Sequence, residues 1–177
     1  MRTFVGAVPL SAVALLVFSL LALALSRVVA DRLGTGRAVA ALLLFGFGLV
    51  LSATLTPTGL ALHGSVTETS CDTTRIGLAP IAELVSVNFT SLNVLLFVPL
   101  GLSIGLLPRT RAMALITLAA VALPFIVEAV QLAITVLDRR CQTADVFDNL
   151  LGLAVGVLLG TLARPLLAAV GPPRRPR

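Results

Sequence analysis

Two polar side chains, Glu128 and Gln131, interrupt an otherwise hydrophobic stretch of the chain. A carboxylate inside a bilayer costs on the order of 3 kcal/mol, so it usually faces a bundle interior or a water-filled cavity. Arg140, Asp145 and Asn149 follow in a short polar loop before the next hydrophobic stretch. A buried glutamate has the chemistry of a general acid, a general base or a proton site, and the planar guanidinium of arginine suits phosphate.

The composition indicates an integral membrane protein. Hydrophobic residues make up 58% of the 177 residues and charged residues only 12%, a balance that soluble domains rarely show. Spans of about 20 residues each leave room for one small bundle, so residues 1–177 are expected to form a single membrane domain. The net charge of +5 comes from arginine, which is common at cytoplasmic span ends, so it does not indicate nucleic-acid binding.

Five hydrophobic stretches must position the polar residues. They predict an all-α, polytopic membrane bundle of about five transmembrane helices, over residues 4–26, 38–55, 90–107, 112–137 and 147–170. The first is longer than the apolar region of a typical signal peptide, which has roughly 7 to 15 residues, so we interpret it as a retained span. The large loop, residues 58–88, either contains a short interfacial helix within 76–87 or is an ordinary ordered loop.

The distribution of arginine predicts the orientation, because cytoplasmic loops carry an excess of basic residues. With the N-terminus outside and the C-terminus inside, the loops 58–88 and 138–146 face out. The cytoplasmic side then holds the basic majority, namely Arg27, Arg32, Arg37, Arg109, Arg111, Arg174, Arg175 and Arg177. The outer side holds Arg2, Arg75, Arg139 and Arg140.

Cys71 and Cys141 then lie in the two outward loops, on the oxidising face of the membrane. They either form a disulfide, which would tie the large loop over the mouth of the fourth and fifth spans, or remain two unpaired thiols. Two cysteines and His63 are too few ligands for a metal site, so neither a metal nor a cofactor is expected.

The predicted topology gathers polar side chains at the outer end of the bundle. Glu128 is expected close to the bilayer midplane, because it precedes Leu137 by nine residues and a helix rises about 1.5 Å per residue. Gln131 shares its helix face. The sequence therefore predicts a polar pocket that opens outward and consists of Asn93, Glu128, Gln131, Arg140, Asp145 and Asn149.

The amides in this set also have a structural interpretation. Asn93, Gln131 and Asn149 are suited to hydrogen bonds between helices, worth about 0.6 to 2 kcal/mol each. Asp148 and Asn149 are also suited to capping the fifth helix, because both residue types accept from free backbone donors at a helix N-terminus.

The charged residues have structural alternatives too. Glu128 either has a functional role or forms an ion pair with Arg139 or Arg140. Arg140 could equally pair with Asp145 in its own loop or with lipid phosphate.

A stripe of small residues runs along the last span. Gly152, Gly156 and Gly160 recur at every fourth position, a spacing that allows a neighbouring helix to approach closely. We interpret this stripe as a packing surface, and assign Gly101 of the third span to helix packing as well.

Three motifs in order resemble the VanZ-like family. They are NVLLFVPLG from Asn93 to Gly101, EAVQ from Glu128 to Gln131, and an R-x4-D-x3-N-x2-G pattern from Arg140 to Gly152. The resemblance covers residues 92–162, as the core of the domain. It implies a multi-pass protein of the bacterial inner membrane whose family namesake is associated with teicoplanin resistance.

Three functional hypotheses follow. In the preferred one, the chain reduces susceptibility to glycopeptide or lipoglycopeptide antibiotics by binding or altering a lipid-linked surface component, such as a cell-wall precursor or an anionic lipid. In the second, Glu128 is the general acid or base of an intramembrane enzyme on such a substrate. In the third, Glu128 is the proton site of a small transporter or complex subunit. The lipid bilayer is the expected partner in all three, and the oligomeric state is left open.

Overall fold

The structure, a computed structural model, describes residues 9–59, 61–63 and 70–170. Among these residues, five helices are long and apolar enough to cross a membrane, which confirms the predicted all-α bundle. The chain is a multi-pass membrane protein. The elements in chain order are α2 (Pro9–Leu33), α3 (Arg37–Thr54), η1 (Ala61–His63), β1 (Cys71–Asp72), α4 (Ile81–Leu84), α5 (Phe89–Leu106), α6 (Arg111–Ala133), η2 (Thr135–Leu137), β2 (Cys141–Gln142) and α7 (Thr143–Val170).

Helix ends differ from the predicted span ends, because hydropathy reports where the chain is apolar and not where its backbone leaves the helix. The first helix continues past residue 26 to Leu33 and ends before Gly34, which has a φ of +62°. The expected start of this span at residue 4 lies outside the described residues. The fourth span ends at Ala133, four residues early, and the fifth begins at Thr143, four residues early.

Local capping explains where two of the helices begin. The Asn88 side chain accepts a hydrogen bond from the backbone N–H of Ser91, whose hydroxyl accepts from the backbone of Asn88. This reciprocal pair satisfies two donors that the first helical turn leaves free. The Thr110 side chain likewise accepts from the backbone N–H of Met113 at the start of α6.

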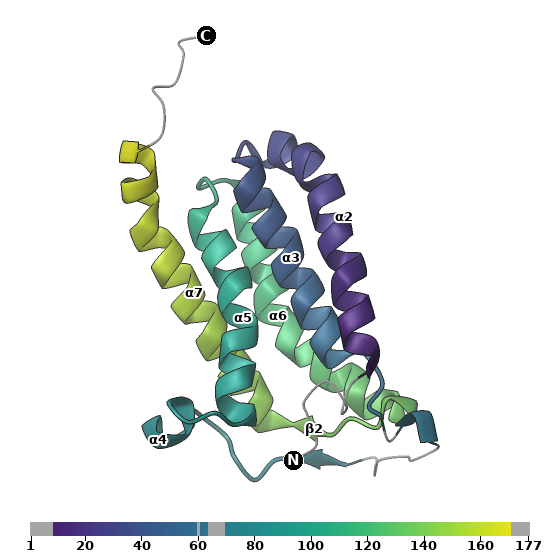
Figure 1. The fold of residues 1–177 in the computed structure, drawn as a ribbon. Helices are drawn as coiled ribbons and strands as arrows, with labels where there is room; N and C mark the ends of the chain where they lie inside the picture. Colours follow the sequence, from purple (N-terminus) through teal and green to yellow (C-terminus); the bar gives the residue numbers. More distant parts are fainter. Residues whose placement is uncertain (1–8, 60, 64–69, 171–177) are drawn as a thin grey trace.

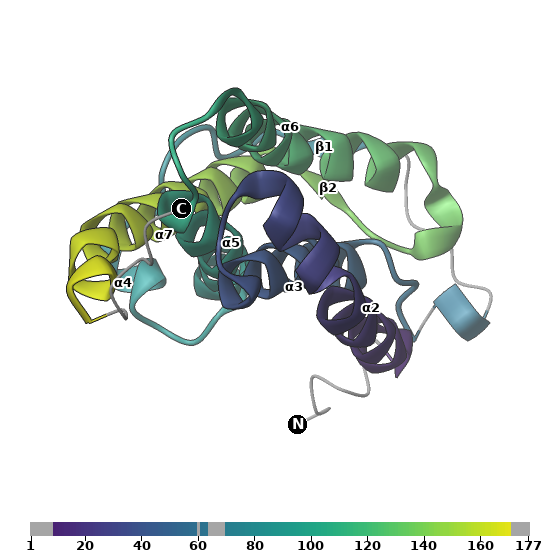
Figure 2. The same cartoon turned by 90° about the horizontal axis from the view of Figure 1, so that it is seen from above.

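The central helix of the bundle is α5. It packs on α3 and, most extensively, on α7, while α2 packs mainly on α3; Figures 1 and 2 show this arrangement from two directions. The most deeply buried side chains include Phe97, Leu100 and Ile104 of α5, with Val50 of α3 and Val127 of α6. The outer face of α2 remains exposed, as expected for a helix that faces lipid.

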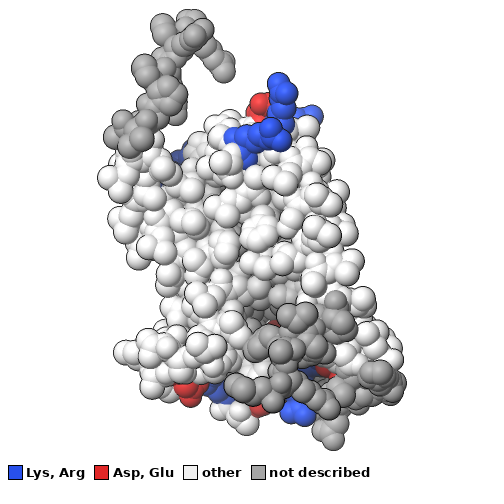
Figure 3. All heavy atoms as spheres, in the orientation of Figure 1, with Lys and Arg blue, Asp and Glu red and all other residues white. Residues whose placement is uncertain are grey.

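The polar segments lie at one end of the bundle. Residues 55–59, 61–63, 70–88 and 134–142 lie there, while the α2–α3 and α5–α6 turns and the C-terminal end of α7 lie at the other (Figure 1). The visible charged side chains gather at these two ends, with an uncharged band between them (Figure 3). Which end faces the cytoplasm stays a prediction. Four arginines used for it, Arg2, Arg174, Arg175 and Arg177, lie outside the described residues.

Within 76–87, where the sequence left a short interfacial helix and an ordinary loop open, the structure has a single helical turn, α4, which packs beside the start of α5. Large apolar side chains in and beside α4 are exposed, including Ile76, Ile81 and Val85. The remainder of the described part of this segment has no regular structure.

Candidate functional site

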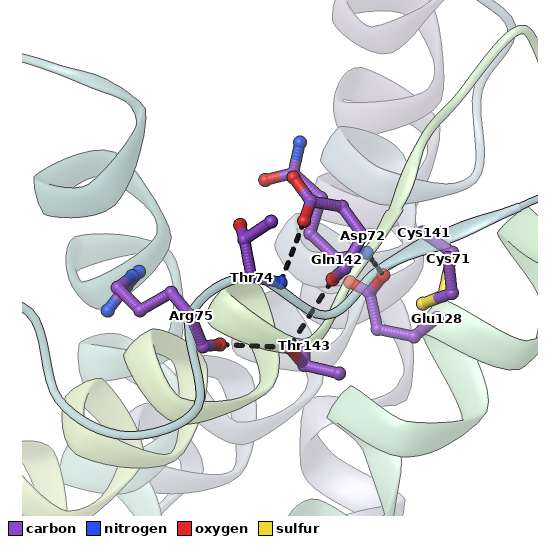
Figure 4. The surroundings of a disulfide bond; sticks show 8 residues. All are labelled: Cys71, Asp72, Thr74, Arg75, Glu128, Cys141, Gln142 and Thr143. Atoms are coloured by element: carbon purple, nitrogen blue, oxygen red, sulfur yellow. Dashed lines mark hydrogen bonds between the residues drawn. A yellow bond between two sulfur atoms is a disulfide. The ribbon is translucent and has the colours of Figure 1, made fainter.

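A short segment, residues 71–77, lies across the start of α7, and we call it the strap. Cys71 and Cys141 form a disulfide with their Cα atoms 4.6 Å apart, the pairing that the sequence left open against two unpaired thiols. Their two-residue strands β1 and β2 run parallel. The Thr143 hydroxyl donates to the backbone carbonyl of Arg75 at 2.9 Å and to that of Asp72 at 3.3 Å (Figure 4). The strap is therefore fixed covalently to β2 and by hydrogen bonds to the first turn of α7.

The strap carries an arginine that sequence reasoning missed as a site residue. Arg75 donates to both carboxylate oxygens of Asp148, at 2.5 and 3.1 Å, and also to the carbonyl of Gly77. The Asp148 side chain is fully buried, so this ion pair compensates a charge that water does not reach. The hydrogen bond to Asp148 raises the pKa of Arg75 above its ordinary value, against the opposing effect of burial.

The predicted capping role of Asp148 and Asn149 is wrong. Because α7 begins at Thr143, both residues lie in its second turn and not at its N-terminus. Asp148 forms the pair with Arg75. Asn149 is buried, and its side-chain oxygen has no hydrogen-bond partner among the described residues.

Glu128 is buried, with 6% of its surface exposed. Its carboxylate accepts a hydrogen bond of 2.7 Å from the backbone N–H of Gln142, the residue just before α7 (Figure 4). Since α6 ends at Ala133, five residues later, Glu128 lies about 8 Å from the helix end, and its depth in the bilayer stays a prediction. Asp145 lies close enough to Glu128 to repel it electrostatically.

The predicted ion pair between Glu128 and Arg139 or Arg140 is wrong. Arg139 donates to the carbonyls of Ala53 and Thr56, at 2.8 and 3.1 Å, and so caps the C-terminal end of α3. Burial lowers the pKa of Arg139. Arg140 is exposed and forms no hydrogen bond or ion pair with any residue that the structure describes.

The alternative pairing of Arg140 with Asp145 is likewise wrong. The carboxylate that Arg140 influences electrostatically is Asp72 of the strap. The Asn93 side chain of α5 lies near enough to Asp145 to influence its carboxylate.

Gln131 engages a different neighbour from Glu128, although both lie on α6. Its side-chain amide donates to the carbonyl of Thr54 at 3.0 Å, so it links α6 to the end of α3. This contact matches the structural interpretation of Gln131 and separates it from the charged groups.

The side chains that the structure does bring together come from α5, α6, α7 and the strap. We call them the polar cluster: Arg75, Asn93, Glu128, Asp145 and Asp148, to which we add Asn149, the buried neighbour of Asp148 in the chain. Arg75 contributes the guanidinium that the sequence assigned to Arg140. The strap lies over the cluster, and Glu128, Asp148 and Asn149 are all buried.

Glycines on α5 and α7 hold these helices close enough for the cluster to form. A Cβ added to Gly156 would lie 2.9 Å from the Cα of Gly101, and one added to Gly160 would lie 2.9 Å from the Cα of Gly105. Gly152 lies against the backbone of Val94, which brings the start of α7 beside Asn93. Gly105 belongs to this crossing and was missed, although it follows Gly101 at the same four-residue spacing.

The cluster favours ligands that donate hydrogen bonds, or protons, over anions. It contains three carboxylates, and its guanidinium already engages both oxygens of Asp148. The described residues include no group of three His, Cys, Asp or Glu side chains placed to hold a metal ion.

Comparison with known proteins identifies the family. No curated protein and no solved structure matches the chain. The model of the VanZ/LLP1 family matches residues 10–164, which extends beyond residues 92–162 to include α2 and α3. Since this match covers most of the 177 residues, the chain belongs to the VanZ/LLP1 family.

Proposed function

We propose that this protein acts in the inner membrane of a bacterial cell and lowers the effect of glycopeptide or lipoglycopeptide antibiotics. It does so by binding or altering a lipid-linked surface component at the end of the bundle that carries the strap. Family membership supports this role. The disulfide supports an oxidising location for the strap, which agrees with the outward orientation predicted from arginine.

The observation that supports the proposal most strongly is that ionisable groups from separate spans lie together beneath the strap. Glu128 comes from α6, and Asp145 and Asp148 come from α7. Placing charged groups within membrane spans is costly, and such groups commonly mark a functional site. The Arg75–Asp148 pair accounts for one of the three carboxylates and leaves Glu128 and Asp145 for a ligand.

In this proposal, the phosphate of the ligand binds outside the cluster and its hydrogen-bond donors bind within it. Arg140 is exposed beside the strap, and its guanidinium can bind phosphate oxygens in a bidentate manner. Glu128 and Asp145 accept hydrogen bonds from the polar part of the same molecule. Because Glu128 is buried, this binding requires the strap to move.

The test is to measure binding of labelled teicoplanin to cells that produce the protein, together with a profile of lipids and cell-wall precursors. Arg140→Gln should raise labelling toward that of cells without the protein, because it removes the phosphate contact. Arg109→Gln is the matched control, since Arg109 is also exposed but lies at the opposite end of the bundle. Equal labelling with and without the wild-type protein would overturn the proposal.

Catalysis is a second candidate, supported by the proximity of two carboxylates, Glu128 and Asp145. Such a pair has the composition needed for general acid–base chemistry on a lipid-linked substrate. Reduced labelling with unchanged precursors supports binding. A new lipid species that disappears in Glu128→Gln supports catalysis.

A further inference from the structure

A groove of about 440 Å³ runs between α6 and α7. Thr117 and Val121 of α6 line one side, and residues of α7 between Leu150 and Thr161 line the other. Both helices are long and apolar enough to span the membrane, and the groove lies well inside their ends. The medium beside it is therefore the hydrocarbon of the bilayer.

The groove follows from the way α7 packs. Its glycines face α5 and bring these two helices into close contact, whereas α7 packs only loosely on α6. Figure 1 shows α7 leaning away from the rest of the bundle toward its C-terminal end. Ala154 and Leu158, which line the groove, are consequently exposed.

The dimensions of the groove fit one hydrocarbon chain. From Leu150 to Thr161 the helix rises about 16 Å at roughly 1.5 Å per residue, close to the 15 Å or so of one leaflet in a hydrocarbon core of about 30 Å. A transmembrane helix of about 10 Å diameter would occupy more than about 1,000 Å³ over this length. The empty space of the groove is smaller than that, so a transmembrane helix of a second copy does not fit wholly within it.

We propose that the groove between α6 and α7 binds one acyl chain of a membrane phospholipid lengthwise. The bound chain completes the loose contact between the two helices. It also holds a lipid beside the polar cluster, because Leu153 in the groove follows the buried Asn149 by one helical turn. This site does not depend on the proposed role in antibiotic susceptibility.

The test uses the purified protein in vesicles of phosphatidylethanolamine and phosphatidylglycerol that contain a small fraction of phosphatidylglycerol with a diazirine in one acyl chain. After irradiation, mass spectrometry of peptides locates the lipid adducts. Adducts should be several-fold more frequent on the groove residues than on the exposed face of α2. Adducts spread evenly over all lipid-facing helices would overturn the proposal.

Substitutions that fill the groove provide the second arm. Ala154→Phe should reduce groove adducts several-fold, and Val121→Phe should do the same from the opposite wall if the first variant is poorly produced. Ala119→Phe is the matched control, because Ala119 is exposed on α6 but does not line the groove. Groove adducts that persist in both filling variants would contradict the proposal, as would a crosslink between two copies through α6 and α7.

Discussion

The two parts of α7 differ in how they contact the rest of the molecule. Its middle packs on α5 through glycines, backbone against backbone. Its first two turns carry charged and amide side chains that face partners from α5, α6 and the strap. The glycine crossing brings the helices together, and the polar cluster uses the proximity that results. One helix thus combines a structural surface with a candidate functional one.

The largest expected effect on stability is at the ion pair beneath the strap. Arg75→Ala leaves the fully buried Asp148 without its cation, which typically costs about 3–5 kcal/mol. Unfolding in detergent micelles measures this change. Adding Asp148→Asn to the same chain should restore much of the loss, because the uncompensated charge disappears.

Arg140→Ala is the matched control for Arg75→Ala. Arg140 is exposed, so its removal should change the free energy of unfolding by no more than about 0.5 kcal/mol. Equal losses for the two arginines would show that the Arg75–Asp148 pair does not stabilise the fold.

Loss of the disulfide should affect the polar cluster more than the place where α5 and α7 pack through their glycines. Replacing both Cys71 and Cys141 by serine removes a link between positions 70 residues apart, which is worth about 2–4 kcal/mol. Hydrogen exchange should increase in the strap while the α5 and α7 amides at the crossing remain protected. Equal loss of protection in both regions would contradict the separation of the two.

Crowding the glycine crossing should have a smaller effect. In Gly156→Ala the new Cβ would lie 2.7 Å from the backbone nitrogen of Leu102, so α5 and α7 must move apart, at a typical cost of about 1–3 kcal/mol. Thermal unfolding of the purified protein measures the loss. Gly36→Ala is the control, since an added Cβ there has no neighbour within 4 Å. A Gly156→Ala variant as stable as this control would refute the close packing.

The smallest expected effect concerns the exposed edge of the strap. The backbone N–H of Thr74 donates to the Asp72 carboxylate at 2.9 Å and holds the pKa of Asp72 below its ordinary value of 3.8. A lowered carboxyl pKa contributes stability above the unfolded pKa, and this contribution is lost as the pH falls below about 4. The protection of the Thr74 amide, its exchange rate compared with that of an unstructured peptide at the same pH, should decrease in that range, and Asp72→Asn should remove this loss. Unchanged protection would contradict this role.

The sequence predicted those parts of the fold that depend on local pattern. Hydropathy located all five spans, and four-residue spacing identified Gly152, Gly156 and Gly160. Span ends were less accurate, since a helix ends where capping and backbone geometry allow. The early start of α7 at Thr143 moved Asp148 and Asn149 from a predicted cap into the helix.

Local sequence pattern could not show which arginine belongs to the polar cluster. Arg139 and Arg140 are adjacent, yet one caps α3 and the other is exposed. Arg75, the cation that pairs within the cluster, is 73 residues from Asp148. A signal was present, because a Cys71–Cys141 disulfide places Arg75, four residues after Cys71, within reach of the start of α7.

We propose that the polar cluster, and Glu128 within it, performs the function. The direct measurement is the susceptibility to teicoplanin of cells that produce Glu128→Gln or the wild-type protein at equal levels in the membrane. Because glutamine keeps the shape and removes the charge, protection should fall to that of cells without the protein. Protection equal to that of the wild type would contradict the account.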